Sequence, residues 1–417
     1  MSHAVGVADP PKYSCPSYST SVGTMPTAPA YDTAEVVVVG RGMFGAAAAR
    51  HLAQGGVDVT AIGPNAYDPD HSPATLNEHD VFSSHNDEAR LTRRQDRDEA
   101  WAEITGRALR DYRALEDASG IDFHHDVGCL IASRPGGDSR NHDPIAQLRA
   151  QGISHEYFGP GDRTWAERWP RLDFPATHAT AFEPSPAGYI RPKHLIAAQE
   201  TLTRRSGGTL LNDIVTGVRP LGAGAGFEIV TATGHHLRSS KVVLAAGAFT
   251  NFNHLIATPV NLELKTEVLV LGEVTPANAD ELARYPTVKY LTDSDVLDAI
   301  YMTPPVQYPD GRSCIKMGAN ICLDTNPTDL DTVQRWFRTA TDDSYLELLQ
   351  PALQALWPDI GFTSFRTRPC IVTYTPDRFP LIAEAQPGLV VATAGNGGGA
   401  KGSDAWGAMA AELVLGN

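Results

Sequence analysis

Three glycines near the N-terminus have the spacing of a dinucleotide-binding turn. Gly40, Gly42 and Gly45 follow the valine run Val36–Val39 and precede an alanine-rich segment. In such a turn the first glycine allows a tight bend, the second lets backbone N–H groups approach a pyrophosphate, and the third lets the following helix pack closely on the strand. The helix N-terminus adds partial positive charge. An ordinary strand-to-helix turn is the alternative, but a second strand predicted at 57–62 completes a βαβ unit and favours the nucleotide site.

One expected part of this site is absent. An acidic residue that binds the adenosine ribose should end the second strand, about 20 residues past the turn, but the chain has Gly63 there. Asn65 is the nearest polar candidate for a ribose contact. The loss keeps open a catalytically silent nucleotide-binding or carrier protein as one alternative.

Two later segments also suit a bound cofactor. The buried run 241–244 ends on the small residues 245–248, where bulkier side chains would collide with a ligand. The segment 388–402 is predicted as a strand followed by a glycine-rich loop, with a helix running on to Leu415. A loop with so few side chains suggests a backbone held against a flat ligand.

Length and charge limit the class of protein. The 417 residues exceed one typical domain and should form two cores. A net charge of −15 argues against nucleic acid or an anionic membrane as a partner. No apolar run approaches the roughly 18 residues of a membrane span, and the N-terminus lacks a signal-peptide pattern, so we expect a cytoplasmic protein. We also expect a monomer or small homo-oligomer.

The cysteines predict neither a disulfide framework nor a metal site. They are few for so long a chain and form no C-x-x-C pair. They stand at positions Cys15, Cys129, Cys314, Cys322 and Cys370.

The order of elements predicts an α/β (α+β) chain that passes in and out of two domains. A proline-rich segment without periodicity, 1–33, is expected to be a flexible arm. We predict a helix that carries Trp101 and stops at Gly120, strands over most of 262–323, and one long helix from Val333 to Leu349. The predicted Rossmann-like FAD-binding domain comprises 34–95, 184–255 and 361–417, and the β-sheet substrate domain comprises 96–183 and 256–360.

From residue 34 to 416 the chain resembles the glycine/D-amino-acid oxidase superfamily of flavoproteins, in the branch of monomeric sarcosine oxidase and N-methyltryptophan oxidase. Four motifs carry the resemblance. The first, 84–93, is similar to the family segment that ends Arg-x-x-Arg. It implies that Arg90 lies over the flavin ring and that Arg93 grips the substrate carboxylate, as a guanidinium fork can do in bidentate fashion. A surface helix pair of Glu88 with Arg93 is the alternative.

The second motif is the segment 314–320. The resemblance places Lys316 on the N5 side of the flavin, where its charge would promote reaction of reduced flavin with dioxygen by stabilising a superoxide-like anion. Relatives carry a histidine where this chain has Asn320. That departure puts an acid or base role at position 320 in doubt.

The third motif, 369–377, resembles the family pattern C-x-x-T-x-T-x-D. It implies that Cys370 is the thioether attachment point of the flavin, whereas a small buried hydrophobe is the alternative. Val372 replaces a tyrosine of the relatives' substrate cavity. Together with Met302 and Asn320, this change indicates that sarcosine itself is a poor substrate.

The fourth motif is the loop 397–401, whose Lys401 would join Arg93 on the carboxylate and so orient an amino acid toward N5. The residues expected to be catalytic are Lys316, Arg90, Arg93 and Lys401. The residues expected to contact FAD are Gly40, Gly42, Met43, Phe44, Gly45, Asn65, Ser84, Arg90, Val215, Ala246, Gly247, Cys370, Gly397, Gly398, Gly399 and Lys401.

The reaction implied by the resemblance is oxidation of a C–N bond in an amino or imino acid. The neutral amine would deliver hydride to N5, and dioxygen would reoxidise the flavin to give hydrogen peroxide. The substrate nitrogen must be unprotonated, so activity should rise with pH. A flavin dehydrogenase that passes electrons to another carrier is a further alternative, which displacement of Lys316 from N5 would favour.

Overall fold

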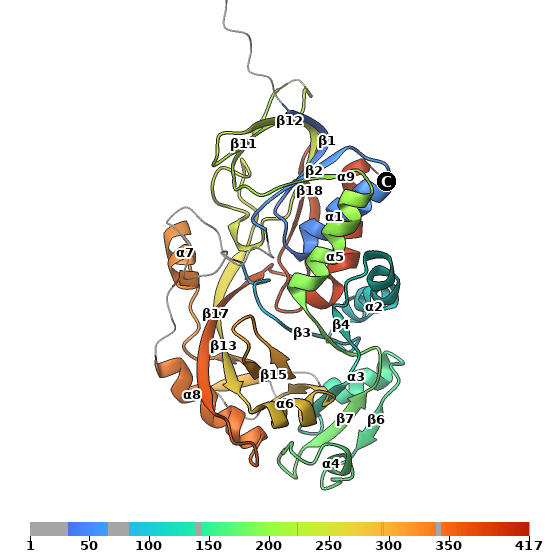
Figure 1. The fold of residues 1–417 in the computed structure, drawn as a ribbon, viewed down its shortest axis with the longest axis vertical. Helices are drawn as coiled ribbons and strands as arrows, with labels where there is room; N and C mark the ends of the chain where they lie inside the picture. The colour runs from blue at the N-terminus through green and yellow to red at the C-terminus, as the bar shows by residue number, and fades with distance from the viewer. Residues whose placement is uncertain are drawn as a thin grey trace, which may run out of the picture. The chain divides into compact units, whose positions relative to one another are not determined.

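The computed structural model describes residues 32–65, 83–137, 143–222, 224–292, 294, 296–338 and 343–416 (Figure 1). Apart from its last two residues, the arm predicted at 1–33 lies outside the described residues, as does Cys15. Asp32 and Thr33 open the first strand, β1 (Asp32–Val39). Residues from Asp32 onward form one compact unit.

An eight-stranded sheet surrounds β1. Its main path runs β10-β11-β12-β1-β2-β9, β19 pairs with the free side of the end of β12, and β18 pairs with β19. The pairs that β1 makes with β12 and β2 are parallel, as in a βαβ unit. The other strands are β2 (Val59–Ile62), β9 (Thr209–Leu211), β10 (Val215–Pro220), β11 (Phe227–Thr231), β12 (His236–Leu244), β18 (Leu381–Gln386) and β19 (Leu389–Thr393).

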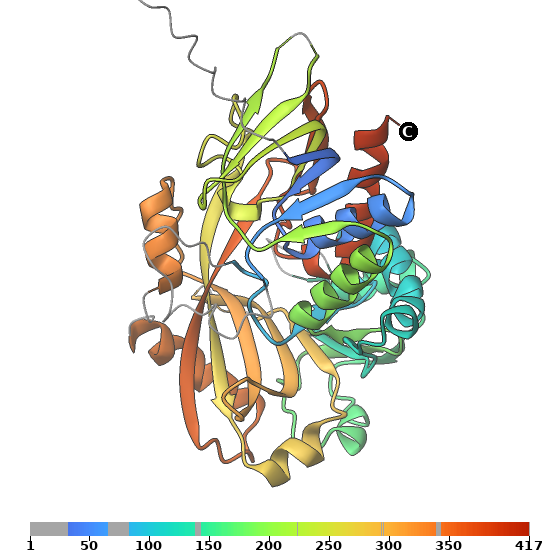
Figure 2. The same cartoon turned by 45° about the horizontal axis from the view of Figure 1, so that its top comes forward.

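Both faces of β1 are buried, as its four valines predict. Val36 and Val38 pack with Ala48 and Leu52 of α1 (Met43–Gln54) and with the C-terminal helix α9 (Ser403–Leu415). Val37 and Val39 face the opposite core, which β10 and β11 help to form. In Figures 1 and 2, α1, α9 and α5 (Pro192–Arg205) lie together on one face of this sheet.

The helix predicted around Trp101 is α2 (Glu99–Ser119). Asp98 caps its first turn by accepting a hydrogen bond from the Ala100 N–H group, and Gly120 ends it in the left-handed conformation with φ of 76°. The helix packs against α5 and α9. Its apolar stripe is therefore core, as the sequence indicates.

A second eight-stranded sheet, mostly antiparallel, runs in the order β17-β13-β16-β15-β14-β5-β7-β6. Its strands are β5 (Cys129–Ser133), β6 (Glu156–Phe158), β7 (Ala179–Glu183), β13 (Glu263–Glu273), β14 (Thr287–Tyr290), β15 (Leu297–Gln307), β16 (Ser313–Ile321) and β17 (Ser364–Tyr374). This confirms the strands predicted over 262–323. The strand β17 falls within the range 361–417 that we assign to the FAD-binding domain, so the domain boundaries stay a prediction.

The single long helix predicted from Val333 to Leu349 is wrong, because the structure has two helices, α7 (Leu330–Arg338) and α8 (Asp343–Leu356). They belong to different cores. Val333 and Phe337 pack with Phe249 and Ile371, whereas Leu349 packs with the second sheet. Helical periodicity alone does not show that two apolar stripes face different partners.

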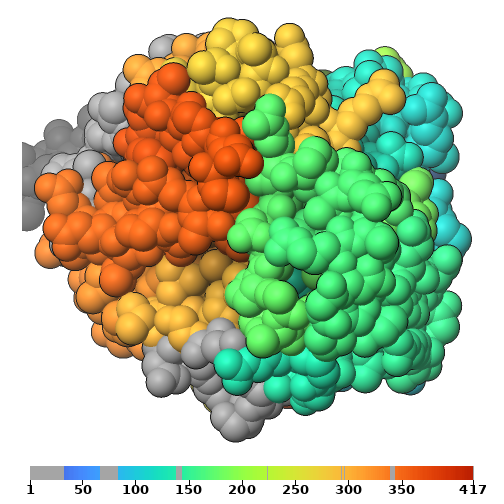
Figure 3. Space-filling view, turned by 90° about the horizontal axis from the view of Figure 1, so that it is seen from below, coloured from blue at the N-terminus to red at the C-terminus, as the bar shows by residue number. Residues whose placement is uncertain are grey.

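Figure 3 shows the end of the molecule that carries the second sheet. The helices α8 (orange-red) and α6 (yellow; Pro276–Leu282) and the green segment with α4 (Trp165–Arg168) cover it. The remaining short elements are β3 (Arg90–Thr92), β4 (His124–His125), α3 (Pro144–Ala150), β8 (Gly188–Ile190), η1 (Gly247–Phe249) and η2 (Gly399–Gly402). A small sheet in the order β3-β8-β4 contains Arg90–Thr92 of the motif 84–93. Within the described part of the chain, no helix is long and apolar enough to cross a membrane.

Candidate cofactor and substrate site

A cavity of about 500 Å³ collects most of the residues that the sequence singles out. Its walls come from the glycine turn, the segment 83–96, one face of the second sheet and the loop 394–401. The expected site residues that line it are Gly40, Gly42, Met43, Phe44, Ser84, Arg90, Arg93, Val215, Ala246, Gly247, Cys370, Gly397, Gly398, Gly399 and Lys401. The expected residues that are not part of this lining are Gly45, Asn65 and Lys316.

The glycine turn has the shape that a dinucleotide needs. Gly40 has φ of 102°, and a Cβ atom there would lie 2.4 Å from the Ala245 carbonyl oxygen. A Cβ atom at Gly45 would lie 1.9 Å from the Gly40 carbonyl oxygen, which explains why position 45 shapes the turn without lining the cavity. No side chain of the described residues caps the N-terminus of α1. Its backbone N–H groups are therefore suited to the pyrophosphate of FAD, and the residues present fit this cofactor.

An arginine occupies the space beside Gly63. The buried Arg41 donates to the Gly63 carbonyl at 3.1 Å and forms an ion pair with Glu200 at 2.7 Å. A Cβ atom at Gly63 would lie 2.8 Å from the Arg41 backbone nitrogen. An acidic residue at the end of β2 would therefore collide with the turn. Asn65 donates its backbone N–H to the Asn212 side chain at 2.9 Å, and a ribose contact from it stays a prediction.

The C-terminal loop brings backbone close to the cavity. Gly397 has φ of 74°, and a Cβ atom at Gly399 would lie 3.2 Å from the Phe44 ring. A Cβ atom at Gly398 would lie 3.5 Å from the Trp101 ring. The missing side chains leave the cavity open beside the loop, as a flat ligand requires.

Arg93 and Lys401 both line the cavity, as a carboxylate clamp requires, but their charges are balanced differently. Lys401 forms a buried ion pair with Asp96. Burial raises the pKa of Asp96, but the charges of Lys401 and Arg93 outweigh this and lower it to about 2. Arg93 donates Nε to Gln95 at 3.3 Å and forms no ion pair with another described residue. The guanidinium of Arg93 is therefore available to an anionic substrate.

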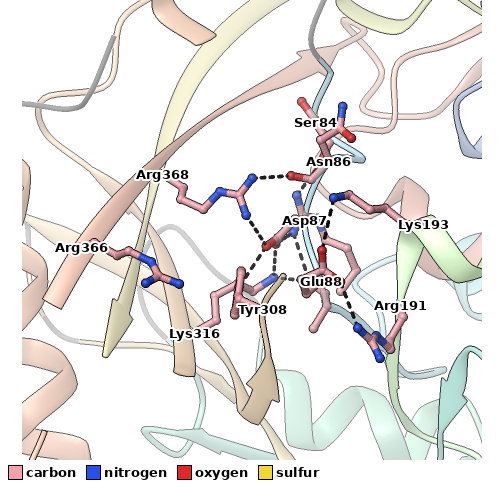
Figure 4. Close-up of polar contacts among 12 residues, drawn as sticks. Ser84, Asn86, Asp87, Glu88, Arg191, Lys193, Tyr308, Lys316, Arg366 and Arg368 are labelled. Atoms are coloured by element: carbon pink, nitrogen blue, oxygen red, sulfur yellow. Dashed lines mark hydrogen bonds and ion pairs between the residues drawn. The ribbon is translucent and has the colours of Figure 1, made fainter. Parts of the chain in front are cut away.

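The alternative in which Glu88 and Arg93 form a helix pair is wrong. Arg90 to Thr92 form a strand, and Glu88 binds Arg191 at 3.1 Å and Lys193 at 3.3 Å (Figure 4).

Lys316 is bound to the buried carboxylate of Asp87 (Figure 4). Its Nζ donates to Asp87 Oδ2 at 2.8 Å and to the Ala89 carbonyl. Arg90 and Tyr308 bind the same carboxylate, the latter at 3.0 Å. Burial lowers the pKa of Lys316 well below its usual range. Asp87 could not be recognised from the sequence as the partner of this lysine, because the two residues are 229 positions apart.

Cys370 lies on β17 and lines the cavity, as an attachment point for the flavin requires. Ser84 Oγ donates to the carbonyl of the next residue, Ile371, at 2.6 Å. This bond ties the segment that carries Arg90 to the strand that carries the cysteine. Val372 and Asn320 also line the cavity, whereas Met302 lies in the core of the second sheet.

Sequence reasoning missed several polar residues of the cavity wall. His85, Asp96, Glu267, Lys289 and Tyr301 all line it. Glu267 directly precedes the apolar run Val268–Leu271 of β13, and Lys289 lies between Val288 and Tyr290 on β14, which is a signal that the sequence offers. Nothing local shows that the two strands share one cavity face.

The mixed sheet with its parallel βαβ unit and glycine turn, the second sheet, and the cavity that both line define a flavin-dependent oxidoreductase. The family model described as FAD dependent oxidoreductase matches residues 35–413, and the chain belongs to this family. The FAD cofactor, the fold class and the family inferred from the motifs are thereby confirmed.

Named relatives agree with this assignment. Monomeric sarcosine oxidase from Bacillus sp. (strain NS-129) is 24% identical over 91% of this chain and 92% of its own. Two solved structures share the fold. NikD, described as an unusual amino acid oxidase essential for nikkomycin biosynthesis, is 21% identical with a TM-score of 0.72 over 92% of this chain and 94% of its own (Tyr258Phe mutant, open form). L-proline dehydrogenase from P. horikoshii is 20% identical with a TM-score of 0.70 over 93% of this chain and 94% of its own.

Proposed function

We propose that the protein oxidises a C–N bond of an amino or imino acid whose carboxylate binds Arg93. The observation that carries this proposal is the guanidinium of Arg93, which lines the cavity without a carboxylate partner among the described residues. Unpaired charge in a partly enclosed site is costly, so an anionic ligand would stabilise it. The relative named monomeric sarcosine oxidase supports the same substrate class.

The chain's own residues would orient the substrate. The guanidinium of Arg93 can donate two parallel hydrogen bonds to a carboxylate. Lys401, whose charge is balanced by Asp96, lines the same cavity. FAD, when bound, would accept the hydride from the carbon next to nitrogen. The substrate nitrogen must be unprotonated for this step, so turnover should rise with pH as the amine loses its proton. Asn320 and Val372 line the same cavity and favour a substrate other than sarcosine.

The test is a panel of primary and secondary amino acids, with flavin bleaching measured without oxygen and peroxide measured with it. Arg93→Ala should lower kcat/KM for the best substrate by the equivalent of about 2–4 kcal/mol and leave FAD content unchanged. Arg94→Ala is the matched control, because Arg94 is the next residue in the chain but does not line the cavity. Equal activity of the two variants would contradict the carboxylate site.

A second candidate is a dehydrogenase that passes electrons to a carrier other than dioxygen. The contact of Lys316 with Asp87 favours it, because a cation already paired with a carboxylate attracts a developing anion less strongly. Substrate-reduced enzyme mixed with dioxygen or with a quinone dye decides between the two. Fast reoxidation by dioxygen would support the oxidase, and reoxidation by the dye alone would support the dehydrogenase.

A further inference from the structure

Lys289 projects from the second sheet into the same cavity as Arg93. It lies on β14 directly opposite Tyr301 of β15, and both residues line the cavity. Residues directly opposite in an antiparallel pair share one face of the sheet. Tyr301 in turn faces Gly318 of β16, where a Cβ atom would lie 2.4 Å from the Tyr301 hydroxyl. The lysine therefore extends the cavity wall that already contains Glu267 and Cys370.

Among the described residues, five lysine or arginine side chains line the cavity, and three of them have a carboxylate partner. Arg41 pairs with Glu200, Arg90 with Asp87 and Lys401 with Asp96. The other two, Arg93 and Lys289, form no ion pair in the described part of the chain, and Lys289 makes no hydrogen bond through its ammonium group there.

The ammonium of Lys289 interacts electrostatically with Arg93, Lys401 and Asp96. Burial, together with the charges of Arg93 and Lys401, lowers the pKa of Lys289 to about 8, while Asp96 and Asp298 act in the opposite direction. Cys129, on the neighbouring strand β5, is affected by both Arg93 and Lys289. Lys289 therefore lies close enough to Arg93 for their charges to interact, and it is mostly charged at pH 7.

We infer that Lys289 binds a second anionic group of the substrate, so that the enzyme prefers amino or imino acids with two anions. The inference rests on the proposed function, because Arg93 must hold the first carboxylate. Two unneutralised cations in one cavity match the two charges of a dicarboxylate, whereas a monocarboxylate leaves one of them desolvated and unpaired. The second group is a carboxylate or a phosphonate-like anion, since an ammonium recognises both as a point charge.

The test compares three ligands of similar length with the oxidised holoenzyme: butyrate, succinate and 3-phosphonopropionate. Binding is followed by the change in flavin absorbance at pH 7. Wild-type protein should bind succinate or the phosphonate about 10-fold to 100-fold more tightly than butyrate. Lys289→Met should abolish this difference while leaving the affinity for butyrate unchanged, and Lys289→Arg should restore much of it.

Lys241→Met serves as the control for a change in net charge, because Lys241 does not line the cavity. The preference for succinate should also fall as pH rises through about 8, where Lys289 loses its charge. If wild type binds butyrate and succinate equally, and Arg93→Ala weakens both, the proposed function stands and this inference is overturned. If wild type binds neither carboxylate, the substrate site itself is wrong, and the inference fails with it.

Turnover gives one further outcome. A lysine that instead removed a proton from the substrate ammonium would change kcat and its pH profile equally for mono- and dianionic substrates. An equal loss in Lys289→Met on both substrate classes, with binding unchanged, would therefore overturn the inference.

Discussion

The two ends of the cavity are built differently. At the nucleotide end, shape comes from backbone: Gly40, Gly45 and Gly399 stand where a Cβ atom would meet another atom at 3.2 Å or less. At the substrate end, charged side chains on the second sheet and on the segment 83–96 form the wall. Ligand binding at the nucleotide end therefore depends on glycines that have no side chain. Ligand binding at the substrate end depends on charged side chains that have no partner of opposite charge among the described residues.

This difference has a consequence for substitutions. A substitution at the nucleotide end should weaken cofactor binding and also destabilise the fold, because the close-packed backbone there can shift only if the whole strand or helix shifts with it. A change at the substrate end should alter chemistry or specificity and leave the fold intact. Three substitutions test this contrast.

The largest effect is expected from Gly45→Ala. Its Cβ atom would lie 1.9 Å from the Gly40 carbonyl oxygen, so α1 must move away from β1. We expect a loss of about 3 kcal/mol or more in unfolding free energy, together with loss of FAD during purification. Gly217→Ala on β10 is the control, because no atom lies within 4 Å of its added Cβ. Thermal unfolding and flavin content are measured for both variants. A Gly45→Ala protein that keeps FAD and the wild-type Tm would contradict the proposed difference between the two ends of the cavity.

A smaller effect, confined to one half-reaction, is expected from Lys316→Met. If the Lys316 ammonium stabilises the anion formed on reduction of dioxygen, reoxidation should slow by about 10²-fold while reduction by substrate changes little. Lys193→Met is the control, because Lys193 pairs with the neighbouring Glu88 and not with Asp87. Stopped-flow measurement of each half-reaction decides the matter. Equal losses in both would show that the lysine acts only by positioning Arg90 through Asp87.

The smallest effect on the fold is expected from Cys370→Ala, which removes one buried sulfur atom from the cavity wall. If Cys370 carries the flavin through a thioether, denatured wild-type chain should keep its yellow colour, and the variant should release all of its FAD. Cys314→Ala is the control, since this buried thiol does not line the cavity. Intact-mass spectrometry of denatured wild type gives the answer, because the mass of the bare polypeptide would exclude the tether.

The sequence determined the parts of this protein that depend on local spacing. The glycine turn, the valine strand and the C-terminal glycine loop are recognisable because their function lies in backbone conformation within a few residues. The motifs 84–93 and 369–377 likewise indicated Arg90, Arg93 and Cys370, which the structure brings to one cavity, whereas Lys316 of the motif 314–320 does not line it.

Only the tertiary structure decided which charges are neutralised. Asp87 and Lys316 are 229 positions apart, Asp96 and Lys401 are 305 apart, and strand pairing alone places Lys289 beside Tyr301. The sequence shows that a residue is charged, but its electrostatic role depends on burial and on partners that the chain supplies from elsewhere. The sequence alone does not distinguish Lys316, Lys401 and Lys289, since each is simply a lysine. In the fold, Lys401 and Lys316 have carboxylate partners, whereas Lys289 has none among the described residues.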